Sequence, residues 1–148
     1  FNAAISACEK GRQWEHAALL FNKMRKDDLT PSVISFNAAI SAHEKCGQWQ
    51  QTLSLLSKMG KAVVSPDVVS FNAVISACEK GGQWEQAALL LSRVQATMEQ
   101  DVISYNAAIS ACEKGMQWAR ALSLLNQLRI AGMTPNVVSF SAATSACE

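Results

Sequence analysis

The apolar positions of this chain follow a helical spacing that stops and restarts at a pair of glycines. In residues 69–80 they stand at i, i+3, i+4 and i+7, which is one face of an α-helix. Gly81 and Gly82 then end this helix, and the same spacing continues from Trp84. We name the two predicted helices A and B. The apolar positions are Phe71, Val74, Ile75 and Cys78 in helix A, and Trp84, Ala87, Ala88, Leu91 and Val94 in helix B.

This helical hairpin recurs along the whole chain. An aromatic residue at the start of helix A recurs at steps of 35, 35, 34 and 35 residues, and the tryptophan that opens helix B keeps the same period. These residues are Phe1, Phe36, Phe71, Tyr105 and Phe140, and Trp14, Trp49, Trp84 and Trp118. A fixed period of this length marks an array of supersecondary units. Alanines at Ala73 and Ala77 give helix A a second apolar stripe for a neighbour. The sequence therefore predicts an all-α fold, an α-solenoid of stacked helix-turn-helix repeats.

The predicted array holds four repeats and part of a fifth. Repeat 1, truncated at its N-terminus, spans 1–32, and the others span 33–67, 68–101, 102–136 and 137–148. A proline and a polar residue close most repeats, but Gln100 and Asp101 close the third, which is one residue shorter. In the second repeat, Gly60 leads us to expect that helix B stops near Met59. Because the chain begins and ends inside a helix A, we expect it to be a piece of a longer array.

Composition and charge narrow the function classes. With 49% apolar and 17% charged residues, the chain can build a continuous core. No apolar run approaches the roughly 20 residues of a transmembrane helix. The net charge of +1 counts against tight electrostatic binding of nucleic acid by this piece. His16 and His43 have no nucleophile or carboxylate constellation around them, and no glycine loop could cradle a phosphate. We therefore expect neither an enzyme, nor a cofactor, nor a small-molecule substrate.

Four of the five cysteines occupy one position of the repeat. They are Cys8, Cys78, Cys112 and Cys147, with His43 in the same place in the second repeat. Equivalent positions on stacked helices lie roughly 8 to 10 Å apart, whereas zinc ligands surround one ion at roughly 2.0 to 2.3 Å. We therefore expect buried thiols and no metal site. The fifth, Cys46, lies in a turn.

Residues 68–80 read Val-Val-Ser-Phe-Asn-Ala-Val-Ile-Ser-Ala-Cys-Glu-Lys, followed by glycine and a helix B rich in Ala and Leu. This pattern resembles a pentatricopeptide repeat, and the resemblance covers the whole chain. The tetratricopeptide pattern fits less well, because only the third repeat has its 34-residue step. The resemblance implies a right-handed superhelix that binds single-stranded RNA, one base per repeat, through two side chains.

The resemblance also implies which side chains read the bases. They are the residue after the aromatic and the last residue of the repeat, with the N-terminal repeat toward the 5′ end of the RNA. The pairs are Asn2 with Ser32, Asn37 with Asp67, Asn72 with Asp101, and Asn106 with Asn136, while Ser141 begins a fifth pair that lacks its partner. We call Ser32, Asp67, Asp101 and Asn136 the closing residues.

The chemistry of these pairs predicts a base preference. An Asn amide both donates and accepts, so it can meet the Watson-Crick edge of a pyrimidine. A carboxylate only accepts, so Asp67 and Asp101 favour uracil, whose ring nitrogen is a donor. Asn136 can donate and suits cytosine, with uracil tolerated, and Ser32 can do either. The predicted site is 5′-(C/U)UU(C/U)-3′, a pyrimidine-rich RNA.

Two further ladders match the family. Aliphatic residues on which neighbouring bases are sandwiched would be Ile34, Val69, Ile103 and Val138. Basic residues along the RNA backbone would be Lys10, Lys45, Lys80 and Lys114. Such phosphate contacts add affinity and salt dependence without sequence information. The family works mostly in mitochondria and chloroplasts, in RNA processing, stability or translation.

Simpler interpretations stand beside these. The closing residues are also good helix N-caps, and a lysine near a helix C-terminus is favoured by the helix dipole. Asn inside a helix costs roughly half a kcal/mol against Ala, so its recurrence favours a working face. The tryptophans open the apolar stripe of helix B and are expected to pack between hairpins. A scaffold that binds other proteins, or a spacer, is the alternative function.

Overall fold

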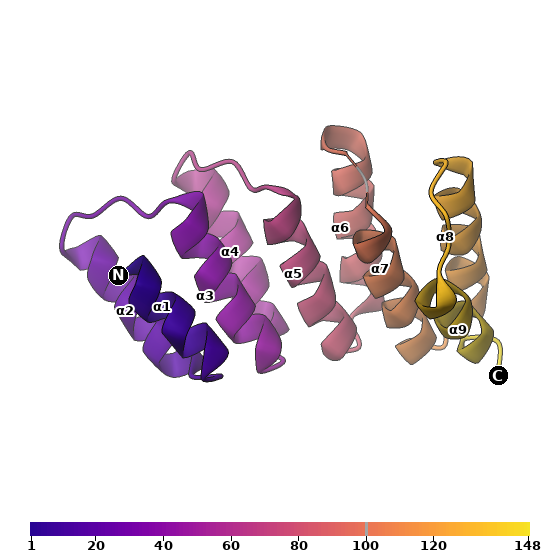
Figure 1. The fold of residues 1–148 in the computed structure, drawn as a ribbon, viewed down its shortest axis with the longest axis horizontal. Helices are drawn as coiled ribbons and strands as arrows, with labels where there is room; N and C mark the ends of the chain where they lie inside the picture. The colour runs from indigo at the N-terminus through magenta and orange to yellow at the C-terminus, as the bar shows by residue number, and fades with distance from the viewer. Residues whose placement is uncertain (100) are drawn as a thin grey trace.

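The computed structural model describes residues 1–99 and 101–148. Within these residues nine α-helices and no strands are present, and the two termini lie at opposite ends of the row (Figure 1). The A helices are α1 (Asn2–Lys10), α3 (Val33–Lys45), α5 (Val68–Lys80), α7 (Val102–Lys114) and α9 (Val137–Ser145). The B helices are α2 (Trp14–Lys26), α4 (Trp49–Lys61), α6 (Trp84–Thr97) and α8 (Trp118–Ile130). The predicted α-solenoid is confirmed.

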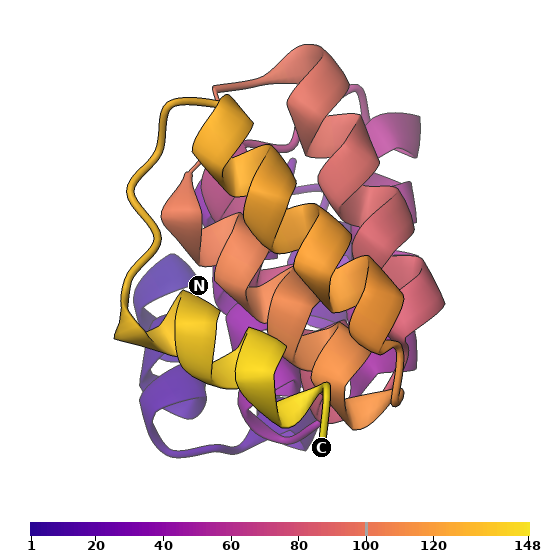
Figure 2. The same cartoon turned by 90° about the vertical axis from the view of Figure 1, so that its right-hand side faces the viewer.

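The helices form two layers of different tightness. Each A helix from α1 to α7 contacts the next A helix and the B helix of its own repeat. No two B helices come within 8 Å, Cα to Cα, among the described residues. The view along the array shows the helices stacked one behind another (Figure 2). Alanines on the second stripe of the A helices, such as Ala77 and Ala111, are fully buried. Small side chains therefore let neighbouring A helices pack directly against each other, whereas neighbouring B helices do not.

The core repeats with the sequence. The aromatic residue of helix A and the isoleucine four residues later are buried in the three complete inner repeats: Phe36, Ile40, Phe71, Ile75, Tyr105 and Ile109. Edge-to-face packing of Phe21 on Phe36, with ring centroids 4.9 Å apart, shows how helix B of one repeat meets helix A of the next. The periodic apolar side chains thus pack both within a repeat and between neighbouring repeats.

One predicted helix end is wrong. Helix α4 does not stop near Met59 but runs through Gly60 to Lys61. Gly60 lowers helix propensity by roughly 1 kcal/mol without forcing an end, and nothing packs within 4 Å of a Cβ placed there. The helix ends instead where Val63 adopts φ +56° and the N–H of Val64 returns to the carbonyl of Met59.

The shorter third repeat has lost one turn residue. After helix B, the other repeats place Asp28, Val63 or Gly132 at positive φ. In the third repeat Thr97 is still helical, and Met98 follows directly in extended conformation. Gln100 lies outside the described residues. The missing residue is therefore the left-handed one that ends helix B.

Within residues 1–99 and 101–148, none of the helices combines the length and apolarity of a membrane-spanning segment.

Candidate nucleic-acid interface

The closing residues are N-caps of the A helices. The side chain of Asp67 accepts a hydrogen bond from the N–H of Ser70 at 2.8 Å, and Asp101 accepts one from Ser104 at 2.8 Å. Ser32 and Asn136 cap α3 and α9 in the same way. The capping role expected from sequence is confirmed, and it fixes all four closing residues at one place in the repeat.

Three of the four predicted base-reading pairs are in direct contact. The amide of Asn37 donates to Asp67 at 3.1 Å, that of Asn72 to Asp101 at 2.8 Å, and that of Asn106 to the side-chain oxygen of Asn136 at 3.2 Å. Despite the deletion in repeat 3, Asp101 therefore meets Asn72 as Asp67 meets Asn37.

The first predicted pair differs. No hydrogen bond joins Asn2 to Ser32 among the described residues, because the serine side chain is shorter than aspartate or asparagine. Asn2 instead accepts a hydrogen bond from the hydroxyl of Ser35 at 2.7 Å. Ser141, the lone member of the fifth pair, is exposed.

A buried serine joins each pair, and sequence reasoning missed it. The hydroxyl of Ser70 donates to Asn37 Oδ1 at 2.6 Å, and Ser104 and Ser139 donate in the same way to Asn72 and Asn106. These three serines and the equivalent Ser35 are all 0% exposed. Their signal was a fixed place in the repeat, two residues before the asparagine or Ser141. We call these Asn, closing and Ser side chains the polar ladder: Asn2, Ser32, Ser35, Asn37, Asp67, Ser70, Asn72, Asp101, Ser104, Asn106, Asn136 and Ser139.

The two aspartates of the polar ladder are held in the charged form. Burial alone would raise the pKa of Asp67, but the N–H and hydroxyl of Ser70 and the amide of Asn37 donate to the carboxylate and lower it. The pKa of Asp101 is lowered against burial by Ser104 and Asn72. Both groups therefore accept hydrogen bonds at neutral pH and do not donate them.

The aliphatic ladder is exposed beside the polar one. Ile34, Val69, Ile103 and Val138 are 66, 61, 65 and 56% exposed, although each lies next to a fully buried serine. Each is the second residue of an A helix, one residue before the ladder serine. This row of exposed aliphatic side chains gives the face apolar surface between successive polar pairs.

Three of the four lysines are engaged in ion pairs between repeats. Lys45 contacts Glu9 at 2.8 Å, Lys80 contacts Glu44 at 2.6 Å, and Lys114 contacts Glu79 at 2.9 Å. A serine of the later repeat also donates to each of these glutamates. Lys10 has no acidic partner among the described residues. The sequence placed Glu and Lys side by side but did not show that each lysine pairs with the glutamate of the preceding repeat.

The tryptophans and thiols pack between repeats. A Cβ on Gly81 would lie 2.3 Å from Trp49 Cδ1, and one on Gly115 would lie 2.2 Å from Trp84 Cδ1. Trp49 and Trp84 are partly buried and each covers a glycine of the next repeat, as expected of packing between hairpins, whereas Trp118 is 58% exposed. Cys78 and Cys112 are buried as expected, and burial raises the pKa of the Cys78 thiol to about 11. Cys8 is only partly buried, and the expectation of a buried thiol is wrong for Cys147, which is exposed. In the described part of the chain, no three His, Cys, Asp or Glu residues gather as metal ligands would.

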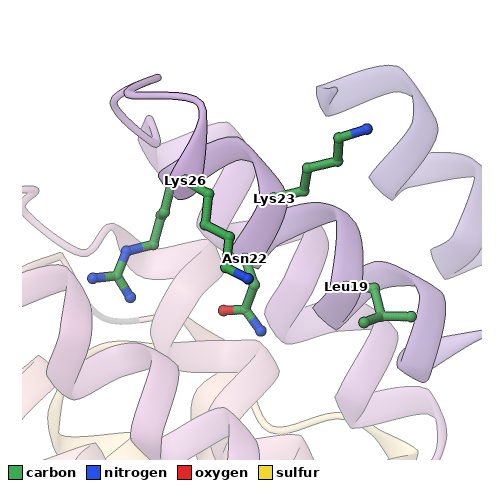
Figure 3. Close-up of a pocket in the computed structure, with 5 residues that line it drawn as sticks. Leu19, Asn22, Lys23 and Lys26 are labelled. Carbon is green, nitrogen blue, oxygen red and sulfur yellow. The ribbon is translucent and has the colours of Figure 1, made fainter.

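Side chains of helix α2 line an open hollow (Figure 3), and none of them belongs to the polar ladder. Its volume is about 710 Å³, and it is lined by Leu19, Asn22, Lys23, Arg25 and Lys26. Lysine and arginine are favoured at a helix C-terminus by the helix dipole. This open cationic surface is therefore explained without a ligand.

The profile of the pentatricopeptide repeat domain matches residues 1–45 and 89–148, and two PPR repeat profiles match residues 31–80 and 69–96. The chain belongs to the pentatricopeptide repeat family. A comparison with curated protein sequences finds no match.

Solved pentatricopeptide repeat structures have the same fold. PPR10 in complex with an 18-nt psaJ RNA element is 24% identical, with a TM-score of 0.85 over 98% of this chain. The PPR domain of Arabidopsis thaliana protein-only RNase P 1, in complex with tRNA, is 14% identical, with a TM-score of 0.84 over 96% of this chain. The match covers 76% of that domain but only 21% of PPR10. This pentatricopeptide repeat chain thus spans about a fifth of PPR10.

Proposed function

We propose that this pentatricopeptide repeat chain binds single-stranded RNA sequence-selectively, one base per repeat, at the site 5′-(C/U)UU(C/U)-3′. The observation that carries the proposal is the contact between Asn and closing residue in three successive repeats. The two residues of each pair lie about 30 positions apart in sequence, yet the three junctions after repeat 2 bring them together beside an exposed aliphatic side chain. The RNA-bound states of PPR10 and of the protein-only RNase P 1 domain support RNA as the ligand.

The base preference follows from the groups that the pairs offer. Asp67 and Asp101 are charged acceptors, which match the ring N–H of uracil and oppose the ring nitrogen of cytosine. Asn136 donates as well as accepts, so the fourth repeat takes cytosine or uracil, and Ser32 gives the first repeat the same tolerance. The sandwich residues Ile34, Val69, Ile103 and Val138 would then contact the faces of the bases without distinguishing them.

Affinity is expected to be modest for four repeats. If each base contributes roughly 1 to 3 kcal/mol by stacking before ordering costs, binding reaches only about micromolar strength or weaker. Each ion-paired lysine has three N–H donors and gives one to a glutamate. In our proposal Lys10, Lys45, Lys80 and Lys114 contact phosphates, and the paired three do so without leaving their glutamates.

The proposed role is occupancy of RNA, and no residue is assigned to catalysis. A bound array can block nucleases, remodel RNA or recruit other factors, which fits a role in organellar RNA processing, stability or translation. The mitochondrial or chloroplast setting is proposed from family membership.

The experiment is fluorescence anisotropy of a CUUC-containing RNA against a purine-rich RNA of equal length, at low and moderate salt. We expect salt-sensitive binding of the pyrimidine RNA that is lost in the Asn37→Ala, Asn72→Ala double variant. The control is Asn22→Ala with Asn126→Ala, since both asparagines are exposed on B helices outside the polar ladder. Equal or absent binding of both RNAs by the folded protein would overturn the proposal and favour a scaffold that binds other proteins.

A further inference from the structure

The asparagines of the polar ladder have a fixed amide orientation. Asn37 Nδ2 lies 3.1 Å from Asp67 Oδ1, while Asn37 Oδ1 lies 2.6 Å from the hydroxyl of Ser70. A flipped amide would place its oxygen against the carboxylate, so two acceptors would face each other. The aspartate and the serine therefore select the same orientation, with the oxygen held by the serine.

The serine is suited to this task because its hydroxyl is enclosed. Ser70 is fully buried, and its oxygen accepts from the N–H of Asp67 at 3.2 Å. Its single proton has Asn37 Oδ1 and Asp67 Oδ1 in reach, at 2.6 and 2.8 Å, and Asn37 is the nearer. The serine thus links the cap of one helix to the asparagine of the preceding repeat.

The same arrangement recurs at the next two junctions. Ser104 donates to Asn72 and contacts Asp101 at 2.6 Å, and Ser139 donates to Asn106 and contacts Asn136 at 3.1 Å. It survives the deletion in the third repeat and the change from Asp to Asn in the fourth. In the capping boxes of α5 and α9 the serine hydroxyl accepts a hydrogen bond from the N–H of the closing residue. Capping therefore uses the hydroxyl as an acceptor and does not account for the bond that it donates to the asparagine.

We propose that Ser70, Ser104 and Ser139 are positioning residues for base recognition, and that they make the asparagine a donor and not an acceptor toward the RNA. The proposal rests on the RNA-binding function proposed above. An asparagine with both groups free can pair with adenine bidentately, using its oxygen for the N6 amino group and its NH₂ for a ring nitrogen. An oxygen held by serine cannot form that pair, whereas the NH₂ still reaches a pyrimidine carbonyl. The serines therefore exclude adenine.

The test uses the Ser70→Ala, Ser104→Ala double variant, with Ser70→Thr, Ser104→Thr as the variant that keeps the hydroxyls. Anisotropy is measured with RNAs containing CUUC and CAAC at the second and third positions. We expect the preference for uracil over adenine to fall roughly fivefold or more in the alanine variant, and to be kept in the threonine variant. Gly81→Ala serves as a control that lowers stability outside the polar ladder; it should leave the preference unchanged. An unchanged preference in the alanine variant would overturn the proposal.

A second measurement needs no RNA. NMR of the free protein follows the side-chain amides of Asn37 and Asn72, which should exchange slowly with water and occupy one rotamer. In the alanine variant we expect faster exchange and rotamer averaging. Unchanged amides in that folded variant would overturn the serine assignment whatever the RNA results. Amides that respond as expected, with no RNA bound by the wild type, would instead overturn the proposed function and with it the exclusion of adenine.

Discussion

The junction between repeats 1 and 2 is built differently from the two that follow it. At the later junctions the five-membered ring of a tryptophan packs against a glycine, Trp49 on Gly81 and Trp84 on Gly115. At the first, Cys46 stands in place of the glycine, and Trp14 packs against His43 with ring centroids 5.6 Å apart. The lysine-glutamate pair is nevertheless present at all three junctions. The apolar contact can therefore be rebuilt while the stacking of the repeats and the ion pair are kept.

The largest expected effect comes from filling the space under a tryptophan. Gly81→Ala would place a methyl group 2.3 Å from Trp49, so the indole must move. We expect a loss of about 1 to 3 kcal/mol in the free energy of unfolding, measured by urea denaturation. Gly11→Ala is the matched control, because its nearest neighbours are 3.5 Å or more from the new methyl. Equal losses from both substitutions would contradict a tryptophan contact at the later junctions.

The stability of the first junction should depend on pH in the histidine range, because only this junction contains a buried histidine among the described residues. Burial lowers the pKa of His43, although Nδ1 donates to the carbonyl of Ala39, and Lys58 lowers it further. Because the unfolded histidine binds a proton near pH 6.5, stability is full above that pH and declines as the pH falls below it. The limit for one proton is about 1.4 kcal/mol per pH unit.

The matched variant for this effect is His43→Cys, which copies Cys78 and Cys112. Between pH 7 and pH 5, the range in which histidine titrates, the free energy of unfolding measured by urea denaturation should decline in the wild type. It should change less with pH in the variant. Asp67, Asp101 and Glu9 have lowered pKa values and lose their contributions only at more acidic pH. The same profile in both proteins would show that His43 is not the group that titrates.

The turn before each tryptophan offers a smaller effect. Met116 has φ +55° and is 83% exposed, whereas the equivalent Gly82 has φ +66°. Since a side chain in this left-handed region costs roughly 1 to 2 kcal/mol, Met116→Gly should raise the free energy of unfolding by about 1 kcal/mol. Gly82→Met should lower it by a similar amount. Shifts of the same sign in urea denaturation would contradict this account.

The smallest effect on stability is expected at the shared ion pair. Glu44→Gln removes the partner of Lys80 and should cost a few tenths to about 1 kcal/mol. The released lysine should strengthen binding of the CUUC RNA at low salt, because it no longer shares its charge with a carboxylate. Glu113→Gln is the matched control, since Glu113 has no ion pair among the described residues yet its loss changes the net charge equally. Equal gains in anisotropy would show that total charge, and not a freed lysine, sets the affinity.

Sequence periodicity predicted what lies within one repeat. The apolar spacing placed helices A and B to within a few residues, and the identity of the closing residues predicted the N-caps. The end of α4 was missed because Gly60 was taken as a stop, whereas helix termination depends on the turn that follows at Val63. The residue with positive φ in that turn is Val63 and not a glycine, so no sequence signal indicated the turn.

Contacts between repeats were harder to predict. The pairing of Lys80 with Glu44 joins residues 36 positions apart, and that of Ser70 with Asn37 joins residues 33 positions apart. A single repeat shows Glu beside Lys and Ser near Asn, so the local sequence suggests partners within one helix. The correct partners depend on the displacement of one repeat relative to the next, which is set by packing of the A layer.

The deletion in repeat 3 has a consequence for how such arrays diversify. Its missing residue precedes Asp101, and the cap on α7 restores the contact with Asn72. The change of length in this connection is thus absorbed before Asp101, and the contacts that follow in the chain are unchanged. Repeats of 34 and 35 residues can consequently stand side by side in one array with the same contact between Asn and closing residue.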